Sequence, residues 1–478
     1  MATTLWPLSI GGVARVDQVA PGRDSCRLQL RSFLPSLSKL PKSRRWFHEV
    51  RLNWERHRRS MKRRFQGPIM QQPRRRRALS HVGGRVETEG DPRETTLLAK
   101  ALEVSPSSDD PDDPSRAHVH GFHTYPARMH PETAAWLVRS FVPPGGRALD
   151  PFCGSGTVLV EAMLQGCEAI GSDLNPVAVM LARCKTRARS SADLSRLVSR
   201  ARECAQFAED RRRARAGASR RFPHEDVRLF EPHVLLELDS LRHKIETLQD
   251  DPDRTDLFLA LSSVLIKLSR KRGDTSDMVD QRRTAPGFAT RLFIGRVEDL
   301  AARVSDFAAQ LPGRVRPARI SQDDATELRS ARGGQVDAII TSPPYAATYD
   351  YISHHDLRIR WLSLDGSAMA RGEIGSRTSY WNMPRGEVRG AWADEVGRFL
   401  FAAHRVLAPG GPLVLLMADS AVGDIVLRAG EVVAHVARDV GFEPVARASQ
   451  DRPHFHGPTM NAFRDRPRAE HAILLRRA

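Results

Sequence analysis

The chain of 478 residues is long enough for two or three domains, or for one large domain with insertions. It has 74 Lys and Arg against 57 Asp and Glu, a formal net charge of +17, which favours a polyanionic partner such as nucleic acid. Its five cysteines form no CxxC pair, which argues against a disulfide framework or a structural zinc site and fits the cytoplasm. No apolar run is long enough to span a bilayer, so we expect no membrane partner.

Residues 1–115 lack the pattern of a folded domain, and we expect a basic arm and linker without a fixed fold. Residues 40–77 are dense in arginine, with tryptophan and phenylalanine between the charges. Such a segment either lies along phosphates or is a tail without function, including translated sequence upstream of a later start at Met61 or Met129. Residues 105–115 have the composition of a linker.

We expect the ordered part to begin near His120, with a helix at 132–141 and a strand at 147–149. Loop 150–157 (Asp-Pro-Phe-Cys-Gly-Ser-Gly-Thr) follows, then a helix and a second strand that ends at Asp173. Glycines let the backbone approach a ligand, and an acid at the second strand's tip is placed to accept both hydroxyls of a ribose. The pattern therefore favours a nucleoside pocket over a structural turn.

The same loop is not a cradle for several phosphates. No Gly-Lys-Ser/Thr follows it, and the third glycine of the dinucleotide fingerprint is missing. We therefore expect a nucleoside with little phosphate.

Residues 186–290 are helical and charged, and they predict an insertion in an α/β core. The insertion either recognises the substrate through its arginines or is a cap that only packs. A helix at 297–310 and a short strand at 319–321 come next, followed by Asp324. Its carboxylate is placed to take the N6 amine of an adenine, with a solvated turn as the alternative.

An apolar strand at 336–340 leads into Ser342, Pro343, Pro344 and Tyr345. Proline fixes the backbone direction, the carbonyl before a proline is free to accept a hydrogen bond, and the tyrosine ring offers a stacking face. A hydroxyl, a fixed carbonyl and a ring at a strand end suit a planar group with an exocyclic amine. A plain strand-end turn is the alternative, and the glycine loop upstream makes it less favoured.

The C-terminal part continues the α/β pattern. His354, His355 and Asp356 suggest a metal site, but no second His/Cys cluster accompanies them, so we predict no metal. We expect a loop at 365–392, a helix at 392–407, a strand at 413–417, a helix at 431–440 and a final hairpin of 444–446 with 472–475.

Together these motifs resemble those of the amino-directed (N4-cytosine or N6-adenine) DNA methyltransferases, which use S-adenosyl-L-methionine. Loop 150–157 is similar to the family's cofactor motif, and Ser-Pro-Pro-Tyr at 342–345 matches its catalytic tetrapeptide. Residues 123–131 are similar to the motif that precedes the loop in permuted members. The resemblance covers about 120–478 and implies a Rossmann-like α/β fold, mostly parallel with an antiparallel last strand. The core halves would be 116–185 and 291–478, separated by the insertion at 186–290.

The resemblance also implies site residues. The catalytic group would be Ser342, Pro343, Pro344 and Tyr345. The cofactor would be held by Tyr125, Asp150, Phe152, Gly154, Gly156, Thr157, Asp173, Leu174, Asn175 and Asp324. Hydrogen bonds from the target amine to Ser342 and to the Pro343 carbonyl would localise its lone pair, and Tyr345 would stack on a base flipped out of double-stranded DNA.

The target is less well specified. A serine first in the tetrapeptide is often seen with N4-cytosine in the family, so we expect N4-cytosine rather than N6-adenine. The Pro-Cys motif of carbon-5 cytosine enzymes is absent. A cognate restriction nuclease, in a restriction-modification pair, is a candidate partner. The alternatives are a tRNA guanine-N2 methyltransferase, which usually has aspartate first and an N-terminal RNA-binding domain, and a catalytically idle nucleic-acid binder.

Overall fold

A mixed sheet organises the part of the chain that the computed structural model describes, which is residues 84–104, 113–273, 280, 283–313, 315–452 and 457–478. Its strand order is β1-β9-β10-β6-β5-β2-β3-β4. The parallel half contains β2 (Arg147–Asp150), β3 (Glu168–Asp173), β4 (Arg319–Gln322), β5 (Ala338–Thr341) and β6 (Pro412–Ala418). The antiparallel half contains β1 (Val86–Gly90), β9 (Phe442–Asp451) and β10 (Ala469–Arg477).

This topology confirms the predicted fold class. The parallel strands follow the apolar runs seen in the sequence, and β10 runs antiparallel between β6 and β9 as the final hairpin. Alternate residues of the strands face opposite sides, as the pleat requires. Ala148, Ala338 and Val414 belong to one core cluster, and their neighbours Leu149 and Ile339 belong to the other.

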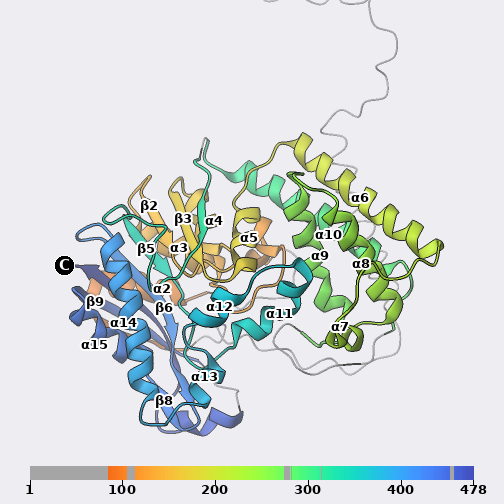
Figure 1. The fold of residues 1–478 in the computed structure, drawn as a ribbon. Helices are drawn as coiled ribbons and strands as arrows, with labels where there is room; N and C mark the ends of the chain where they lie inside the picture. Colours follow the sequence, from red (N-terminus) through yellow and green to blue (C-terminus); the bar gives the residue numbers. More distant parts are fainter. Residues whose placement is uncertain (1–83, 105–112, 274–279, 281–282, 314, 453–456) are drawn as a thin grey trace, which may run out of the picture. The chain divides into compact units, whose positions relative to one another are not determined.

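Helices cover both faces of the sheet. One face packs against α2 (Pro92–Leu102), α3 (Pro131–Phe141), α4 (Thr157–Leu164) and α5 (Pro176–Lys185). The other packs against α14 (Val388–Val406) and α15 (Ala429–Asp439), as Figure 1 shows. The other elements outside the helical insertion are η1 (Pro114–Arg116), η2 (His118–Gly121), α11 (Tyr351–Leu362), α12 (Ser367–Gly372), α13 (Arg377–Trp381), β7 (Ser420–Val422), β8 (Ile425–Leu427) and η3 (Gly457–Phe463).

The predicted helical insertion is a cluster of its own helices. It contains α6 (Ser191–Arg213), α7 (His224–Leu229), α8 (Pro232–Glu246), α9 (Arg254–Leu268) and α10 (Phe288–Gln310). Helix α10 packs against α6, α8 and α9, so the predicted boundary between residues 290 and 291 cuts a continuous helix. Buried Asp253 and Asp256 both pair with Arg189, so part of the arginine content of this segment serves packing.

The expectation that residues 1–115 have no fixed fold is wrong for residues 84–104. Strand β1 pairs with β9 at the edge of the sheet. Asp91 caps α2 by accepting from the backbone N–H groups of Arg93 and Glu94, and Leu98 and Leu102 are buried. The sequence signal was weak because β1 is largely exposed and carries no apolar alternation. Residues 1–83 and 105–112 lie outside the described part.

The loop expected at 365–392 also differs from the structure. It contains the short helices α12 and α13, and α14 begins at Val388. Asp350 organises this segment by accepting from Ser376 Oγ, Arg377 Nε and Thr378 N. The sequence shows little apolar periodicity here, because these helices are short and are held by an acceptor more than twenty residues away in the chain.

Among the described residues, no helix has both the length and the apolar character needed to cross a membrane.

Gly90, at the end of β1, provides a test of this added strand. Its φ is +104°, and a Cβ placed there would lie 2.2 Å from the Val445 carbonyl oxygen. Gly90→Ala should therefore lower the free energy of unfolding by about 1–3 kcal/mol, measured by chemical denaturation. Gly217→Ala is the matched control, because a Cβ at Gly217 meets nothing within 4 Å. If the two variants were equally stable, β1 would not be packed against Val445 at Gly90 as the structure shows.

Candidate active site

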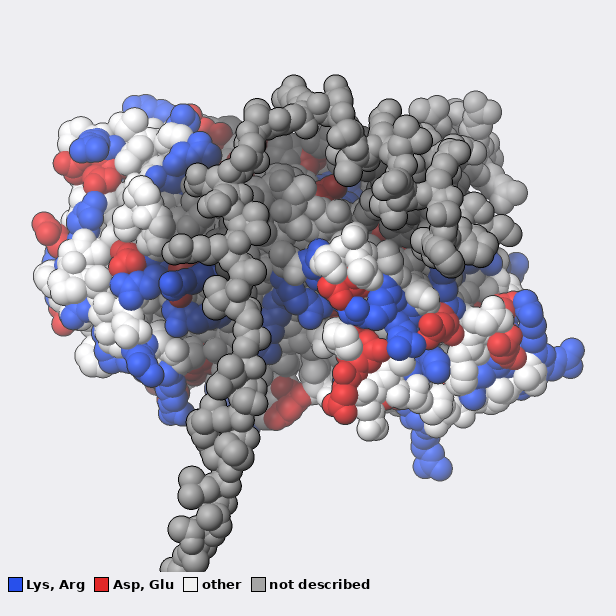
Figure 2. All heavy atoms as spheres, turned by 90° about the horizontal axis from the view of Figure 1, so that it is seen from above, with Lys and Arg blue, Asp and Glu red and all other residues white. Residues whose placement is uncertain are grey.

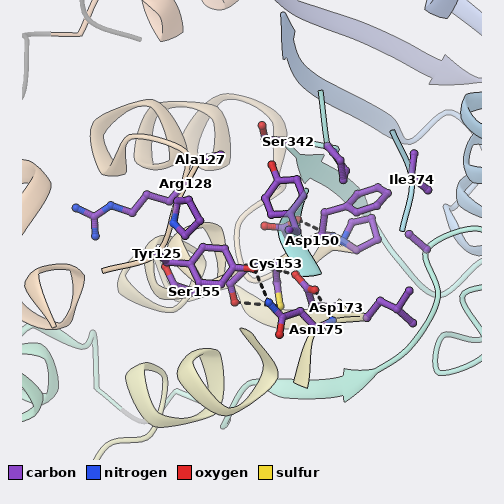
Figure 3. A pocket seen from close by; sticks show the side chains of 18 of the residues that line it. Tyr125, Ala127, Arg128, Asp150, Cys153, Ser155, Asp173, Asn175, Ser342 and Ile374 are labelled. Carbon is purple, nitrogen blue, oxygen red and sulfur yellow. Dashed lines mark hydrogen bonds between the residues drawn. The ribbon is translucent and has the colours of Figure 1, made fainter. Parts of the chain in front are cut away.

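A cavity opens where the parallel strands end, and it contains about 890 Å³ of space including its mouth (Figure 3). Asp150, Asp173 and Ser342 lie at or just beyond the ends of β2, β3 and β5 and converge on it. Nine of the ten residues predicted to hold a cofactor line this cavity: Tyr125, Asp150, Phe152, Gly154, Thr157, Asp173, Leu174, Asn175 and Asp324. A cavity of this size at the carboxyl edge of a parallel sheet is a usual ligand site.

Gly156 is the predicted cofactor residue that does not line the cavity. Its φ is 84° at the N-cap of α4, and its N–H donates to the Cys153 carbonyl at 2.7 Å. A Cβ there would meet Ala182 at 3.1 Å. Gly156 therefore shapes the turn and allows α4 and α5 to pack closely.

Asp173 is the central acid of the cavity. Its two carboxylate oxygens accept from the backbone N–H groups of Gly154 and Asn175, each at 2.8 Å. Burial raises the pKa of Asp173 to about 6, against the opposing effect of these hydrogen bonds. The carboxylate therefore ties the glycine loop to the end of β3 and remains an acceptor at neutral pH.

Asp150 links the two motifs found in the sequence. Its Oδ1 accepts from Thr341 Oγ1 at 2.6 Å and from Phe152 N at 3.2 Å. Burial raises the pKa of Asp150 to about 7. The last residue of β5 thus holds the first residue of the glycine loop.

The segment before α3 forms one wall of the cavity. The Tyr125 hydroxyl accepts from Asn175 Nδ2 at 3.3 Å, and its ring lies 4.9 Å from that of buried His355. The guanidinium of Arg128 points away from the other labelled groups in Figure 3 and donates to the carbonyls of His120 and Ser115. Arg128 therefore supports this wall from behind.

Ser155 is a residue that the sequence analysis did not select. It is 2% exposed, lines the cavity, and its Oγ has no hydrogen-bond partner among the described residues. A buried hydroxyl without a partner costs free energy, which a polar ligand would recover. Its position between Gly154 and Gly156 in the loop is the signal that could have identified it.

A second wall comes from residues far along the chain. Tyr351, Met369, Gly372, Glu373 and Ile374 all line the cavity. Glu373 accepts from Tyr351 N at 2.5 Å, and burial raises the pKa of its carboxyl to about 7. A Cβ at Gly372 would come within 2.8 Å of the Leu174 side chain, so this wall approaches β3 closely. No motif in the sequence marked these residues, because their position depends on α11 and α12.

Asp324 lies two residues beyond β4 and lines the cavity. Its Oδ1 accepts from the N–H and hydroxyl of Thr326, each at 2.8 Å. These bonds fix the carboxylate beside Leu174 and Ala325 in the same wall. The placement is compatible with the predicted contact to an adenine amine.

The tetrapeptide divides between two environments. Ser342 and Pro344 line the main cavity, whereas Pro343 and Pro344 line a smaller apolar pocket with Trp392. Tyr345 lines neither of these two cavities, and its hydroxyl donates to Glu470 Oε1 at 3.0 Å. Ser342 and Pro344 of the predicted catalytic group therefore lie at the predicted cofactor cavity, whereas Tyr345 does not line it.

The trio His354, His355 and Asp356 does not assemble into a metal site. His355 is buried against Tyr125, whereas Asp356 is exposed and forms an ion pair with Arg360. Their order on helix α11 sends neighbouring side chains in different directions.

Another set of possible ligands consists of His118, His120 and Glu161. His120 Nε2 and Glu161 Oε1 are 2.7 Å apart. Burial, together with the positive charges of Arg303 and Lys185, lowers the pKa of His118 to about 4. Because the same charges oppose a cation, we assign no metal to this set.

Comparisons with known proteins agree with this geometry. Residues 43–183 match the family model described as DNA methylase. The matched segment begins well before the first of the sequence motifs. The chain is 28% identical over 267 residues to the type II methyltransferase M.MvaI of Kocuria varians, covering 52% of this chain and 58% of that protein. It is 37% identical over 68 residues to the type II methyltransferase M.MjaII of Methanocaldococcus jannaschii, covering 14% and 13%.

A third relative modifies RNA. The chain is 44% identical over 62 residues to the tRNA (guanine(10)-N2)-dimethyltransferase of Methanothermobacter thermautotrophicus, covering 13% of this chain and 18% of that protein. In all three comparisons, less than two thirds of the relative's length is covered.

The fold and the cavity define a Rossmann-like protein whose main cavity lies beside a Ser-Pro-Pro-Tyr strand end. Together with the family model and the M.MvaI match, they confirm the resemblance found in the sequence. Over the matched residues, the chain is similar to the amino-directed DNA methyltransferases.

Proposed function

We propose that this protein transfers a methyl group from S-adenosyl-L-methionine to an exocyclic amine of a DNA base. The observation that carries the proposal is the Asp150–Thr341 hydrogen bond of 2.6 Å, which joins the cofactor loop to the strand bearing Ser342. The family-model match and the likeness to M.MvaI support the methyl donor and the DNA substrate. Bound in the cavity, the sulfonium cofactor supplies an activated methyl group for in-line displacement.

The lining residues fit such a cofactor. Asp173 offers its carboxylate to the ribose hydroxyls, and Asp324 offers one to the adenine amine. The buried hydroxyl of Ser155 finds no partner within the described part of the chain, which suits the polar methionine end. Gly154 leaves room for the ligand, because a Cβ there would already lie 3.0 Å from the Tyr125 ring. Aromatic, acidic and backbone groups thus match a nucleoside with a charged amino-acid tail.

At the target, the protein's task is to position a weak nucleophile. The lone pair of an exocyclic amine is delocalised into the base. Hydrogen bonds from the amine to Ser342 and to the Pro343 carbonyl favour tetrahedral geometry at nitrogen, and Tyr345 stacks on the base after it flips out of the duplex. We assign N4 of cytosine in preference to N6 of adenine, because Ser342 takes the place of aspartate in the tetrapeptide.

The positive charge is concentrated in one part of the chain. Residues 1–83 carry 19 Lys and Arg and four Asp and Glu, a net charge of +15, whereas residues 84–478 carry 55 and 53, a net charge of +2. On the face shown in Figure 2, Lys and Arg are correspondingly interspersed with Asp and Glu. We infer that residues 1–83, which lie outside the described part, supply most of the salt-dependent attraction to the DNA backbone.

The helical insertion at 186–290 is proposed to contribute to target recognition, and a cognate restriction nuclease is a proposed partner. Some cations of the insertion are buried in ion pairs, whereas others, such as Arg202 and Arg213 on α6, are exposed. These two are only partly neutralised, because their pairs with Glu298 and Glu209 lie at the surface.

The test is methylation of DNA in cells that express the full chain, followed by mass spectrometry of the nucleosides. We expect N4-methylcytosine in DNA, and none in cells that express the Ser342→Ala variant. N6-methyladenine alone would overturn the base assignment but keep the reaction class. Methylated guanine in tRNA with unmodified DNA would instead support a tRNA guanine-N2 methyltransferase. This alternative is favoured by the local match to a tRNA methyltransferase.

A further inference from the structure

Trp381 is exposed on the segment that leads away from the main cavity. It is the last residue of α13 and is 43% exposed. Met460 on η3 is another large apolar side chain in solvent, 57% exposed. Helix α13 and η3 both pack against β7, so these residues belong to one lobe, formed by α13, the β7–β8 hairpin and η3 (Figure 1). Large apolar side chains exposed in one lobe beside a cavity are typical of an interaction surface.

Hydrogen bonds fix α13 relative to the Ser-Pro-Pro-Tyr strand end. The Gly375 carbonyl accepts from Ala347 N, two residues beyond the tetrapeptide, at 2.9 Å. Gly375 N and the Tyr380 hydroxyl both donate to Glu395 Oε2, at 2.9 and 2.6 Å. Tyr380 is buried, and the next residue on a helix points about 100° away from it, so Trp381 faces solvent. The indole ring is therefore held at a fixed place relative to the tetrapeptide.

The same segment continues the cavity wall and carries positive charge. Ile374 lines both the main cavity and the smaller apolar pocket, seven residues before Trp381. Residues 376–389 contain three Arg and one Glu, a net charge of +2, which equals the net charge of all residues 84–478. Arg389 is exposed, as are the polar residues Thr378, Ser379 and Asn382. Cations and neutral donors around an aromatic ring suit the phosphates and bases of a nucleic acid.

We propose that the α13 lobe is a contact surface for the duplex beside the target, with Trp381 stacking on a base next to the one that flips out. Flipping leaves neighbouring bases without a stacking partner on one side, and an indole ring restores that contact. Arg389 contacts the nearby phosphates. The inference rests on the proposed function, because it requires a base flipped out of double-stranded DNA. Residues 1–83 attract the DNA backbone, whereas this lobe holds the duplex at the cavity.

Substitution of Trp381 tests the stacking contact. Trp381→Ala should raise the KM for unmethylated plasmid DNA about tenfold, because stacking on the ring is lost. Its kcat and its Kd for S-adenosylmethionine should stay within about threefold of the parent, since Trp381 lines neither cavity. Trp381→Phe keeps an aromatic face and should recover most of the loss. Transfer of labelled methyl groups and calorimetry of the cofactor measure these quantities.

Fluorescence gives a readout that a purely structural role would not change. Stacking on a base quenches indole emission, so duplex DNA should quench the parent more than it quenches Trp381→Phe. The chain has seven tryptophans, and the other six are present in both proteins. The difference in quenching therefore reports on Trp381.

Phe401→Ala is the matched control for the tryptophan. Phe401 is 66% exposed and lies 13 residues beyond the start of α14, about 20 Å along that helix from the end that follows α13. Its removal should leave the KM for DNA unchanged.

Arg389→Gln tests the phosphate contact. It should weaken DNA binding and reduce the slope of log affinity against log salt concentration by about one. Arg438→Gln is its control, because Arg438 is an exposed residue of α15 shortly before β9 begins, at the opposite edge of the sheet. That variant should keep the parent's slope.

Several results would overturn the proposal. These are a parent-like KM for Trp381→Ala, an equal loss in Phe401→Ala, equal quenching of the parent and Trp381→Phe, or quenching by tRNA with none by duplex DNA. Thermal unfolding of all variants separates misfolding from loss of contact. If the parent methylates DNA and Trp381→Ala is unaffected, this inference fails and the proposed function stands. Absence of DNA methylation by the parent would overturn the proposed function and this inference with it.

Discussion

Asp173→Ala is expected to abolish measurable binding of S-adenosylmethionine, with a loss of affinity of roughly 100-fold or more. The carboxylate is the proposed acceptor for two ribose hydroxyls, and each charge-assisted hydrogen bond contributes about 1.5–3 kcal/mol. The variant also leaves the N–H groups of Gly154 and Asn175 without their acceptor. Isothermal titration calorimetry with the purified full chain measures the change.

Asp323→Asn is the matched control for this variant. Asp323 follows β4 and accepts from Ser330, but it does not line the cavity, so the affinity should stay within a few-fold of the parent. The pH dependence gives a second measurement of the same carboxylate. Because burial raises the pKa of Asp173 to about 6, the ionised acceptor is lost as the pH falls below 6, and affinity should drop by about tenfold per pH unit there. Unchanged affinity in Asp173→Ala would refute the ribose role.

Tyr345→Ala should lower kcat/KM for DNA by roughly 10- to 100-fold while cofactor affinity stays unchanged. Stacking of a base on an aromatic side chain contributes about 1–3 kcal/mol, and alanine removes the whole ring. Cofactor binding is spared because Tyr345 does not line the main cavity. Transfer of labelled methyl groups to duplex DNA, with calorimetry of the cofactor, separates the two effects.

Tyr345→Phe is the natural comparison, since it retains the stacking face and should be more active than the alanine variant. A turnover equal to that of the parent in Tyr345→Ala would refute the stacking role. Loss of cofactor binding together with turnover would show that the ring supports the cavity instead.

The sequence predicted the parts of the site that local chemistry determines. Gly154, Asp173 and Ser342 follow apolar strands, and parallel strands end at one edge, so their convergence was foreseeable. Tyr351 and Glu373 were not foreseeable, because α11 and α12 bring them back over the cavity through contacts distant in the chain. The roles assigned to all these residues remain proposals.

The fold shows the same division. The parallel half of the sheet was predicted from buried apolar runs, and the final hairpin from two short ones. Strand β1 was missed because only Val86 is partly buried along it, so its place depends on backbone pairing with β9. Glu470 was missed for a related reason, since its partner Tyr345 lies 125 residues earlier.

The hydrogen bond between Thr341 and Asp150 has a consequence for recombining relatives of this chain. The two residues are 191 positions apart, yet both are buried and their polar side chains are hydrogen-bonded to each other. A chimera that takes residues 116–185 from one relative and 291–478 from another would pair side chains selected in different backgrounds. Wherever the donor of the second piece has an apolar residue at position 341, the Asp150 carboxylate would be enclosed with one acceptor bond fewer. Crossover points for such chimeras are therefore better placed so that β2 and β5 come from the same parent.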